Sequence, residues 1–515
     1  MGKAGEAVNY LMGIDLGTSS VKVIVIDEYG KILAQASEKY PILTPSPSWA
    51  EQDPDRWWSA TRNAIRKALQ SPNLERAEIK AIGFSGQMHG AVFLDSSLKP
   101  LRPAIIWADA RSSPQCEEIR RKLGEERIIE ILSNPIMPGF MAPSLLWVKE
   151  NEPSIYERIH KVILPKDYIR FKLTGSLATD FSDASATLLF DVRRRCWSEE
   201  AISELGFRED FFPELRESAE VVGELSREVA EELSLNKGVE VVTGGGDSPV
   251  SAVGCGLIEA GMVSVNIGSA GQVFAVLKEF KMDPKLRIHT FCHAAPDTWY
   301  MQGAILSAGI TLDWLIEKLG LKSPLEQMSL NPYDKLVEEA SRVRKGSEGL
   351  IFLPYLLGER SPHMDPDARG AFIGLSLTHG RAHLVRAVME GVAFALRDSL
   401  EILKELGIAV SEITIRGGGG RIKLWRQIIA DVFNCRVKTA AVEEAAFGAA
   451  ILAGIGAKVY RGFEDAIRRT VRMGESCEPS PGREVYDGLY EVYRSLYPAL
   501  RDQLHSLASI QKRQG

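Results

Sequence analysis

Residues 241–256, VVTGGGDSPVSAVGCG, place an acid where chemistry on a bound ligand is possible. Val241 and Val242 belong to an apolar strand, three glycines follow, and Asp247 begins a small-residue segment with helical character. Glycines allow backbone conformations that other residues resist, and they let another group approach the main chain closely. An acid held at the end of such a strand points into the cleft that lies there. We predict that Asp247 is a catalytic base, to which a phosphate and a hydroxyl are brought.

The first strand and turn of the chain have the composition of an anion site. An apolar run ends in Asp15, a turn follows, and the next strand carries Lys22; the turn residues are Gly17, Thr18, Ser19 and Ser20. Strand, glycine turn and strand form an antiparallel hairpin, unlike a Rossmann unit or a P-loop. Exposed N–H groups, hydroxyls and the lysine favour phosphate binding, and Asp15 is a candidate Mg²⁺ ligand, directly or through water. The alternative is a tight hairpin with a surface acid.

Polar residues also follow the buried strand 79–84, in the segment SGQMHG at 85–90. His89, beside Met88, stands where a polar side chain can meet a small ligand; the alternative is a hydrogen-bonded structural histidine. Trp107, at the end of a predicted strand 104–107, and Ser248, next to Asp247, are further candidate substrate contacts. The acids of the polar stretch 180–187 either cap helices or line a cleft.

The second half of the chain repeats the opening pattern of strand, glycine–hydroxyl turn and strand. Asn266-Ile267-Gly268-Ser269 falls 251 residues after Asp15-Leu16-Gly17-Thr18, which is about half the chain. A later strand, 413–416, runs into four glycines that include Gly417 and Gly418, and a helix follows. Helix N-termini favour anions. We interpret the chain as two similar halves, with a phosphate chain held between two hairpins in the interdomain cleft.

Length and composition agree with two large domains, predicted at 1–257 and 258–515. Segment 445–455 is expected to be a tightly packed helix, and a charged amphipathic helix from 484 to 511 closes the chain and is expected to pack back on the first domain. A net charge of −6 argues against non-specific nucleic-acid binding. No stretch is apolar enough to span a membrane, and residues 1–10 lack a signal-peptide core. Six scattered cysteines fit a reducing, cytoplasmic compartment.

Taken together, these motifs resemble those of the FGGY family of carbohydrate kinases, and most closely its xylulokinase branch, over nearly the full length. The residues that carry the resemblance are DLGTSSVK at 15–22, SGQMHG at 85–90, LPKDYIRFKLTG at 164–175, GGGD at 244–247, FCHA at 291–294, FLPYLLGERSPH at 352–363 and RGGGG at 416–420. The C-terminal signature of the family also matches, at Gly370, Phe372, Gly374, Leu375, His383, Leu384, Ala387 and Glu390.

The resemblance implies an α/β protein of two actin-like, ribonuclease-H-like ATPase domains with a catalytic cleft between them. It implies ATP and Mg²⁺ as cofactors, and transfer of the γ-phosphoryl group to a primary hydroxyl of a ketopentose, with D-xylulose first. By the family's pattern, Asp247 accepts the hydroxyl proton and Asp15 helps to place the metal. Thr18 and Lys22 contact the phosphates, Met88 and His89 the sugar, and Gly268, Ser269, Gly417 and Gly418 the nucleotide. A homodimer is a further expectation from the resemblance.

Three departures from the family pattern keep other substrates open. Ser248 replaces the Asn that usually follows the catalytic Asp, Ser144 stands where the signature usually has Lys, and Ser269-Ala270 replaces Thr-Ser. Because Asn reaches farther than Ser, one sugar contact is lost or remade. The alternatives are a kinase for another ketopentose or pentitol, such as ribulose, L-xylulose or ribitol, and a non-catalytic actin-like sensor of sugar and ATP. A sensor needs no base, so Asp247 favours catalysis.

Overall fold

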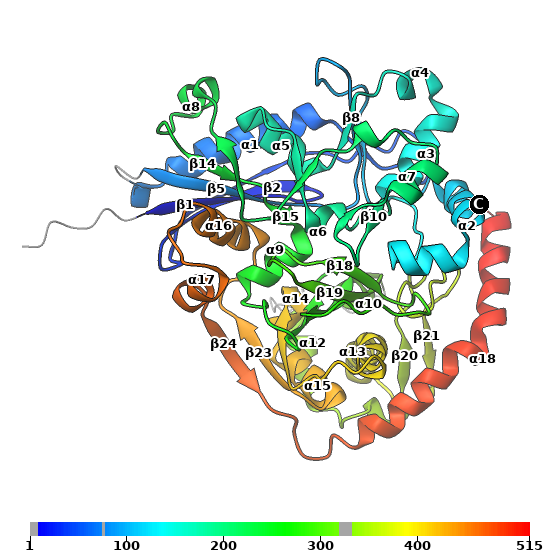
Figure 1. Cartoon of the computed structure of the whole chain (residues 1–515). Coiled ribbons are helices and arrows are strands. Elements are labelled where there is room, and N and C mark those ends of the chain that lie inside the picture. The colour runs from blue at the N-terminus through cyan, green and yellow to red at the C-terminus, as the bar shows by residue number, and fades with distance from the viewer. Residues whose placement is uncertain (1–8, 75–77, 319–331, 515) are drawn as a thin grey trace, which may run out of the picture.

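The computed structural model of the chain describes residues 9–74, 78–318 and 332–514. Each half of the chain contains one large mixed β-sheet, and the two sheets lie one above the other with helices between and around them (Figure 1). Residues 1–8, on which most of the signal-peptide prediction falls, lie outside the described residues.

The first sheet has the strand order β3–β2–β1–β5–β14–β13, and the short strand β15 also pairs with β5. The hairpin β1–β2 and the pair β2–β3 are antiparallel, β5 and β14 follow in parallel, and β13 is antiparallel at the edge. The bounds of these strands are Tyr10–Leu16 for β1, Ser20–Asp27 for β2, Ile32–Lys39 for β3, Ile79–Gly86 for β5, Val221–Glu224 for β13, Glu240–Val242 for β14 and Gly245–Gly246 for β15.

The second sheet repeats this arrangement strand for strand. Its order is β19–β17–β16–β22–β23–β24, with β18 added beyond β19, and its pairs have the same sequence of antiparallel and parallel directions. The predicted internal repeat is thus confirmed, and the β16–β17 hairpin corresponds to β1–β2. The bounds are Val263–Ile267 for β16, Gly271–Leu277 for β17, His289–Cys292 for β18, Trp299–Ile305 for β19, Glu412–Arg416 for β22, Arg436–Ala440 for β23 and Met473–Cys477 for β24.

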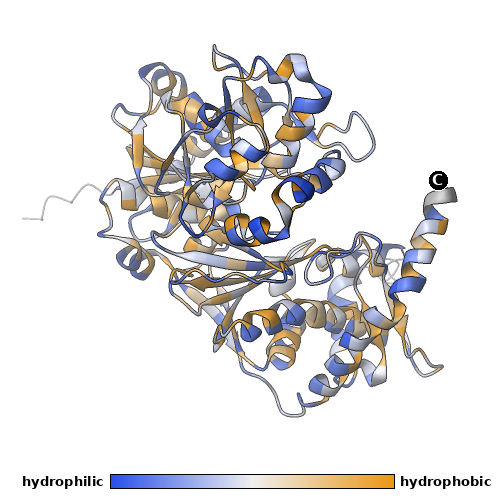
Figure 2. Cartoon of the chain, turned by 45° about the vertical axis from the view of Figure 1, so that its right-hand side comes forward, coloured by the Kyte–Doolittle hydropathy of each residue, from blue (hydrophilic) through white to orange (hydrophobic). Residues whose placement is uncertain are grey.

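Helices cover both sheets, and their apolar faces meet the strands (Figure 2). The first half contains α1 (Pro54–Leu69), α2 (Ser113–Arg127), α3 (Met141–Asn151), α5 (Pro165–Thr174), α6 (Phe181–Ala184), α7 (Glu199–Glu204), α8 (Arg227–Leu233) and α9 (Asp247–Gly254). The second half contains α10 (Gly309–Lys318), α12 (Pro332–Ser341), α13 (Arg381–Glu405), α14 (Gly417–Gly420), α15 (Lys423–Phe433), α16 (Ala445–Gly456), α17 (Phe463–Thr470) and α18 (Val485–Gln514).

One helix of the second half, α16, packs on the first sheet, against β1, β5 and α9 (Figure 1). Glycines make this contact possible. A Cβ on Gly13 would lie 1.8 Å from the carbonyl oxygen of Ala446, and one on Gly83 would lie 2.0 Å from that of Ala449. Since no real Cβ tolerates such distances, the two strands and the helix approach each other only because these positions are glycine. The tight packing predicted for segment 445–455 is confirmed.

The terminal helix α18 packs differently from the expectation that it returns to the first domain. Its buried residues Tyr486, Tyr490, Tyr493, Tyr497 and Leu504 belong to the hydrophobic core of the second half. Four of them are aromatic and supply a continuous apolar face to the β20 (Ile351–Leu353) and α15 region. The element that connects the second half to the first sheet is therefore α16 rather than the last helix.

None of the helices in the described part of the chain is long and apolar enough to cross a membrane.

Candidate active site

The turn that carries Asp247 lies beside β5, one of the central strands of the first sheet. Gly244 has a φ of +80° and lies so close to β5 that a Cβ would come within 2.5 Å of the Cβ of Phe84. Gly245 and Gly246 pair with the end of β5, and Asp247 then opens α9. Its Oδ1 accepts a hydrogen bond of 2.7 Å from the Ser248 N–H, and Oδ2 is left for a ligand. The glycine turn therefore places the carboxyl group at the end of two paired strands, as predicted.

Asp15 lies two strands away from this turn. In the sheet register it pairs with Lys22 on β2 and with Ser85 on β5, and Ser85 pairs in turn with Gly245. The Ser85 hydroxyl donates to Asp15 Oδ1 at 2.8 Å. Burial and the nearby Asp15 carboxylate raise the pKa of Asp247 to about 7. Burial also raises the pKa of Asp15, against the hydrogen bond from Ser85 and the charge of Lys22.

The two acids line a cavity of about 390 Å³ between the halves of the chain. Asp15, Asp247, Ser248 and Ser251 form the wall of the first half. The wall of the second half consists of Asn266, Gln272, Arg416, Gly417, Arg421, Glu443, Glu444 and Ala445. The predicted interdomain cleft is thus present, with the proposed base on one side and a glycine of the GGGG segment on the other.

Of the four glycines, Gly417 reaches the cavity and has a backbone that only glycine suits. Its φ is +83°, and a Cβ would lie 2.6 Å from Asn266 Oδ1. Its N–H donates to Glu443 Oε2 at 2.9 Å. Gly418 is exposed and would meet nothing within 4 Å of an added Cβ, so a ligand has room to approach its main chain. The segment forms a helical turn, α14, of its own.

The tips of the two hairpins lie nearer to solvent. Ser19 and Ser269 are exposed. The Gly17 N–H donates to the Ser20 carbonyl within its turn, and the Gly268 carbonyl accepts a bond from the Gly309 N–H at the start of α10. Lys22, predicted to contact phosphate, forms an ion pair of 3.7 Å with Glu444 of the second half. An incoming phosphate would therefore compete with Glu444 for this lysine.

Met88 and His89 lie beside the Asp247 turn. The space next to Gly246 is filled by Met88, because a Cβ there would lie 2.8 Å from its Sδ. His89 has a φ of +74°, its ring lies 3.8 Å from that of Phe140, and its Nδ1 is 2.8 Å from the Ala186 carbonyl oxygen. Burial lowers the pKa of His89 to about 4, so the ring is neutral. Nδ1 must then carry the proton, which leaves Nε2 as an acceptor for a hydroxyl.

Trp107, a predicted substrate contact, is hydrogen-bonded to the turn of the first hairpin. Its indole N–H donates to Thr18 Oγ1 at 2.8 Å, and 38% of the residue is exposed. Because the Thr18 hydroxyl accepts this bond, its own hydrogen stays available for an anion. Thr18 and Trp107, predicted separately as phosphate and substrate contacts, are thus brought together.

Sequence reasoning missed several charged residues of the cleft. Arg416 directly precedes the glycines, and its Nη1 donates to Ser251 Oγ of the first half at 2.6 Å. Glu443 and Glu444 precede α16 and face the cavity. The position of Arg416 beside GGGG was the available signal, whereas nothing near Glu443 marked it before the packing of α16 was known.

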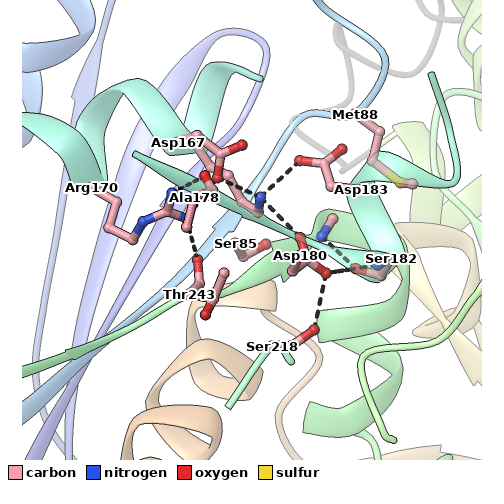
Figure 3. Close-up of polar contacts among 12 residues, drawn as sticks. Ser85, Met88, Asp167, Arg170, Ala178, Asp180, Ser182, Asp183, Ser218 and Thr243 are labelled. Carbon is pink, nitrogen blue, oxygen red and sulfur yellow. Dashed lines mark hydrogen bonds and ion pairs between the residues drawn. The ribbon is translucent and has the colours of Figure 1, made fainter. Parts of the chain in front are cut away.

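A buried ionic cluster adjoins the segment that leads to Asp247, which Arg170 contacts at Thr243 (Figure 3). Lys166 is fully buried, and its Nζ lies 2.8 Å from Asp167, 2.9 Å from Asp180 and 3.2 Å from Asp183. The sequence left the acids of 180–187 open between helix capping and cleft lining. Asp180 does cap α6, through a 2.8 Å bond from the Ser182 N–H, and it also belongs to the ionic cluster.

The chain is similar to known carbohydrate kinases over most of its length. The sequence profile of the FGGY family of carbohydrate kinases, N-terminal domain, matches residues 10–254, and that of the C-terminal domain matches residues 263–457. The chain is 39% identical to the xylulose kinase of Escherichia coli K12 over 95% of its own length and 99% of the relative's. It is 42% identical to the xylulose kinase of Klebsiella pneumoniae, over 86% and 89% of the two chains.

A solved structure shares the fold. The crystal structure of a xylulose kinase from Brucella ovis superimposes with a TM-score of 0.89 at 38% identity, and the alignment covers 96% of this chain and all of that one. Together with the matched family profiles, this confirms the expected α/β architecture of two actin-like domains.

Proposed function

The chain belongs to the FGGY family of carbohydrate kinases, and from this premise we propose that it transfers the γ-phosphoryl group of ATP to the primary 5-hydroxyl of D-xylulose. The observation that carries the proposal is the position of Asp247. Its carboxyl group lies on one wall of the interdomain cavity, opposite the Gly417 turn on the other wall. Near-full-length similarity to xylulose kinases supports the choice of sugar.

Asp247 acts as the general base. Phosphoryl transfer has a loose transition state, so the protein mainly positions the reactants and neutralises charge. The base receives the hydroxyl proton late, and a carboxylate within hydrogen-bond reach is sufficient for that. A pKa of about 7 makes Asp247 a stronger base than an ordinary surface aspartate, while leaving it largely ionised at slightly alkaline pH.

The metal and the phosphates fit the wall of the first half, near Asp15, and the rest of the nucleotide fits the wall of the second half. Mg²⁺ binds one or two protein carboxylates and keeps waters or phosphate oxygens as its other ligands. Asp15 offers one such carboxylate, and its charge adds to burial in raising the pKa of Asp247, so a cation beside Asp15 is favoured. When bound, the metal would neutralise phosphate charge. Thr18, Gly17, Ser19 and Lys22 would bind the phosphates, and Gly268, Ser269, Gly417 and Gly418 the rest of the nucleotide.

On the sugar side, His89 Nε2 accepts a hydroxyl, and Met88 and Trp107 supply apolar surface. Ser248, adjacent to the base, faces the cavity. Its shorter side chain is the reason to keep other ketopentoses and pentitols as the second candidate class. A homodimer remains a prediction from the resemblance, and a cytoplasmic location remains a prediction from the composition of the sequence.

Rates of sugar-dependent ADP formation test the substrate assignment. Wild-type protein with Mg-ATP is offered D-xylulose, D- and L-ribulose, L-xylulose, xylitol, ribitol, glycerol and gluconate. We expect kcat/KM for D-xylulose to exceed that for each other compound by about tenfold or more, since a site built to bind particular hydroxyls discriminates strongly. A higher kcat/KM for another compound would overturn the assignment of D-xylulose and leave the mechanism in place.

A further inference from the structure

The main chain that leads to Asp247 is held by side chains from a different part of the fold. The Gly246 N–H donates to the Ser182 hydroxyl oxygen at 3.1 Å. Earlier in the same segment, the Thr243 carbonyl oxygen accepts a hydrogen bond of 2.8 Å from Arg170 Nη1. The Gly244 N–H donates a hydrogen bond of 2.9 Å to the Ser218 carbonyl oxygen. Each of these partners lies outside the strand, and none of them lines the cavity.

Asp180 determines how Ser182 can bond. Asp180 Oδ2 accepts hydrogen bonds from the Ser182 hydroxyl and from the Ser182 N–H at 2.8 Å, and a third of 3.0 Å from the Ser218 hydroxyl (Figure 3). A serine hydroxyl has one hydrogen and two lone pairs. Because the hydrogen of Ser182 is committed to Asp180, a lone pair is directed at the Gly246 N–H.

The ionic cluster in turn holds Asp180. Its Oδ1 lies 2.9 Å from Lys166 Nζ in an ion pair, while Oδ2 accepts the three hydrogen bonds from the two serines. Asp180, Ser182 and Lys166 are all fully buried, so water does not compete for these bonds. On its other side, the Gly246 peptide packs against Met88, where a Cβ would come within 2.8 Å of Sδ. The peptide before the base is therefore confined from two sides, by Ser182 and by a candidate sugar contact.

We propose that Asp180 and Ser182 are positioning residues for the catalytic base: the ordered chain from Lys166 through Asp180 and Ser182 to the Gly246 N–H sets the location of the Asp247 carboxylate relative to the sugar hydroxyl. This inference rests on the proposed function, because it takes Asp247 as the base. A displacement of about 1 Å at a reacting group is enough to lower the rate by about a hundredfold.

Two serine variants separate positioning from general stability. Ser182→Ala and Ser218→Ala each remove one buried hydroxyl that donates to the same oxygen of Asp180. The Ser182 hydroxyl also bonds the segment that carries the base. Ser218 contacts that segment through its main-chain carbonyl, which Ser218→Ala keeps. We expect similar decreases in the melting midpoints of the two variants. We expect Ser182→Ala to lower kcat by about tenfold to a hundredfold with an unchanged KM for ATP, and Ser218→Ala to keep the wild-type kcat.

The assays are run below both melting midpoints, on the compound that the wild-type protein phosphorylates fastest. Equal kcat values for the two variants would overturn the inference, because stability alone would then account for both. A wild-type preference for another sugar would overturn the substrate assignment without affecting this comparison, so the two failures are distinguishable.

Discussion

Asp247→Asn is expected to lower kcat for sugar phosphorylation by about 10²- to 10⁴-fold, the usual contribution of a general base. The amide preserves the size of the side chain and its contact with the Ser248 N–H but cannot accept the hydroxyl proton at neutral pH. ATP affinity, measured by isothermal titration calorimetry, is expected to stay close to that of the wild-type protein. Asp283→Asn is the control, because Asp283 does not line the cavity and binds Arg287 instead.

The pH dependence gives an independent view of the same residue. A base works only when it is deprotonated, so the raised pKa of Asp247 means that wild-type kcat/KM falls as the pH decreases through about 7. The residual activity of Asp247→Asn should lack this dependence. If Asp247→Asn kept the wild-type kcat, another group would have to accept the proton, and the assignment of Asp247 as base would be wrong.

Lys166→Met is expected to lower the free energy of unfolding by about 3–5 kcal/mol, which is typical when one partner of a buried ion pair is removed. This is the largest effect on stability that we expect among the variants described. Burial opposes the charge on Lys166, but Asp167, Asp180 and Asp183 outweigh it and raise its pKa. Arg170 lies 2.6 Å from Asp167 and compensates that carboxylate alone. In the variant, Asp180 and Asp183 would be left with no cation in the cluster.

Urea denaturation measures this loss, with Lys80→Met as the control. Lys80 lies at the surface, where its side chain is 45% exposed and pairs with Glu240 at 3.6 Å. Exposed pairs of this kind contribute about 0–1 kcal/mol. Equal unfolding free energies for Lys166→Met and Lys80→Met would show that the buried carboxylates are not held by Lys166, and would remove the support for Asp180 described above.

Local patterns in the sequence were sufficient to predict much of the site. A strand, a glycine turn and an acid or hydroxyl recur at Asp15, Asp247 and Gly268, and each lies at the end of a strand in the structure. The repeat was visible because both halves keep the same strand order, so equivalent turns occur at equivalent distances along the chain. Asp15 and Asp247, the two acids on the first-half wall of the cleft, followed from these local patterns alone.

Contacts between distant segments could not be predicted in the same way. The small residues of 445–455 indicated close packing but not its partner, which depends on Gly13 and Gly83 in another half of the chain. The tyrosines of α18 indicated an apolar face, but the sequence did not show whether this face packs on the core of the first half or on that of the second half. In the same way, Lys166 and Asp180 look like ordinary surface residues until the fold buries them together.

The most direct test of the proposed reaction is phosphorus NMR of the wild-type protein incubated with Mg-ATP and D-xylulose. The proposed reaction yields a new phosphomonoester on carbon 5 of the sugar, ADP in equal amount, and no ATP consumption without sugar. ADP with inorganic phosphate at the same rate with and without D-xylulose would contradict it, as would intact ATP in the presence of sugar. Sugar-independent formation of ADP and inorganic phosphate would identify an uncoupled ATPase. Intact ATP in the presence of sugar would favour a sensor of sugar and ATP.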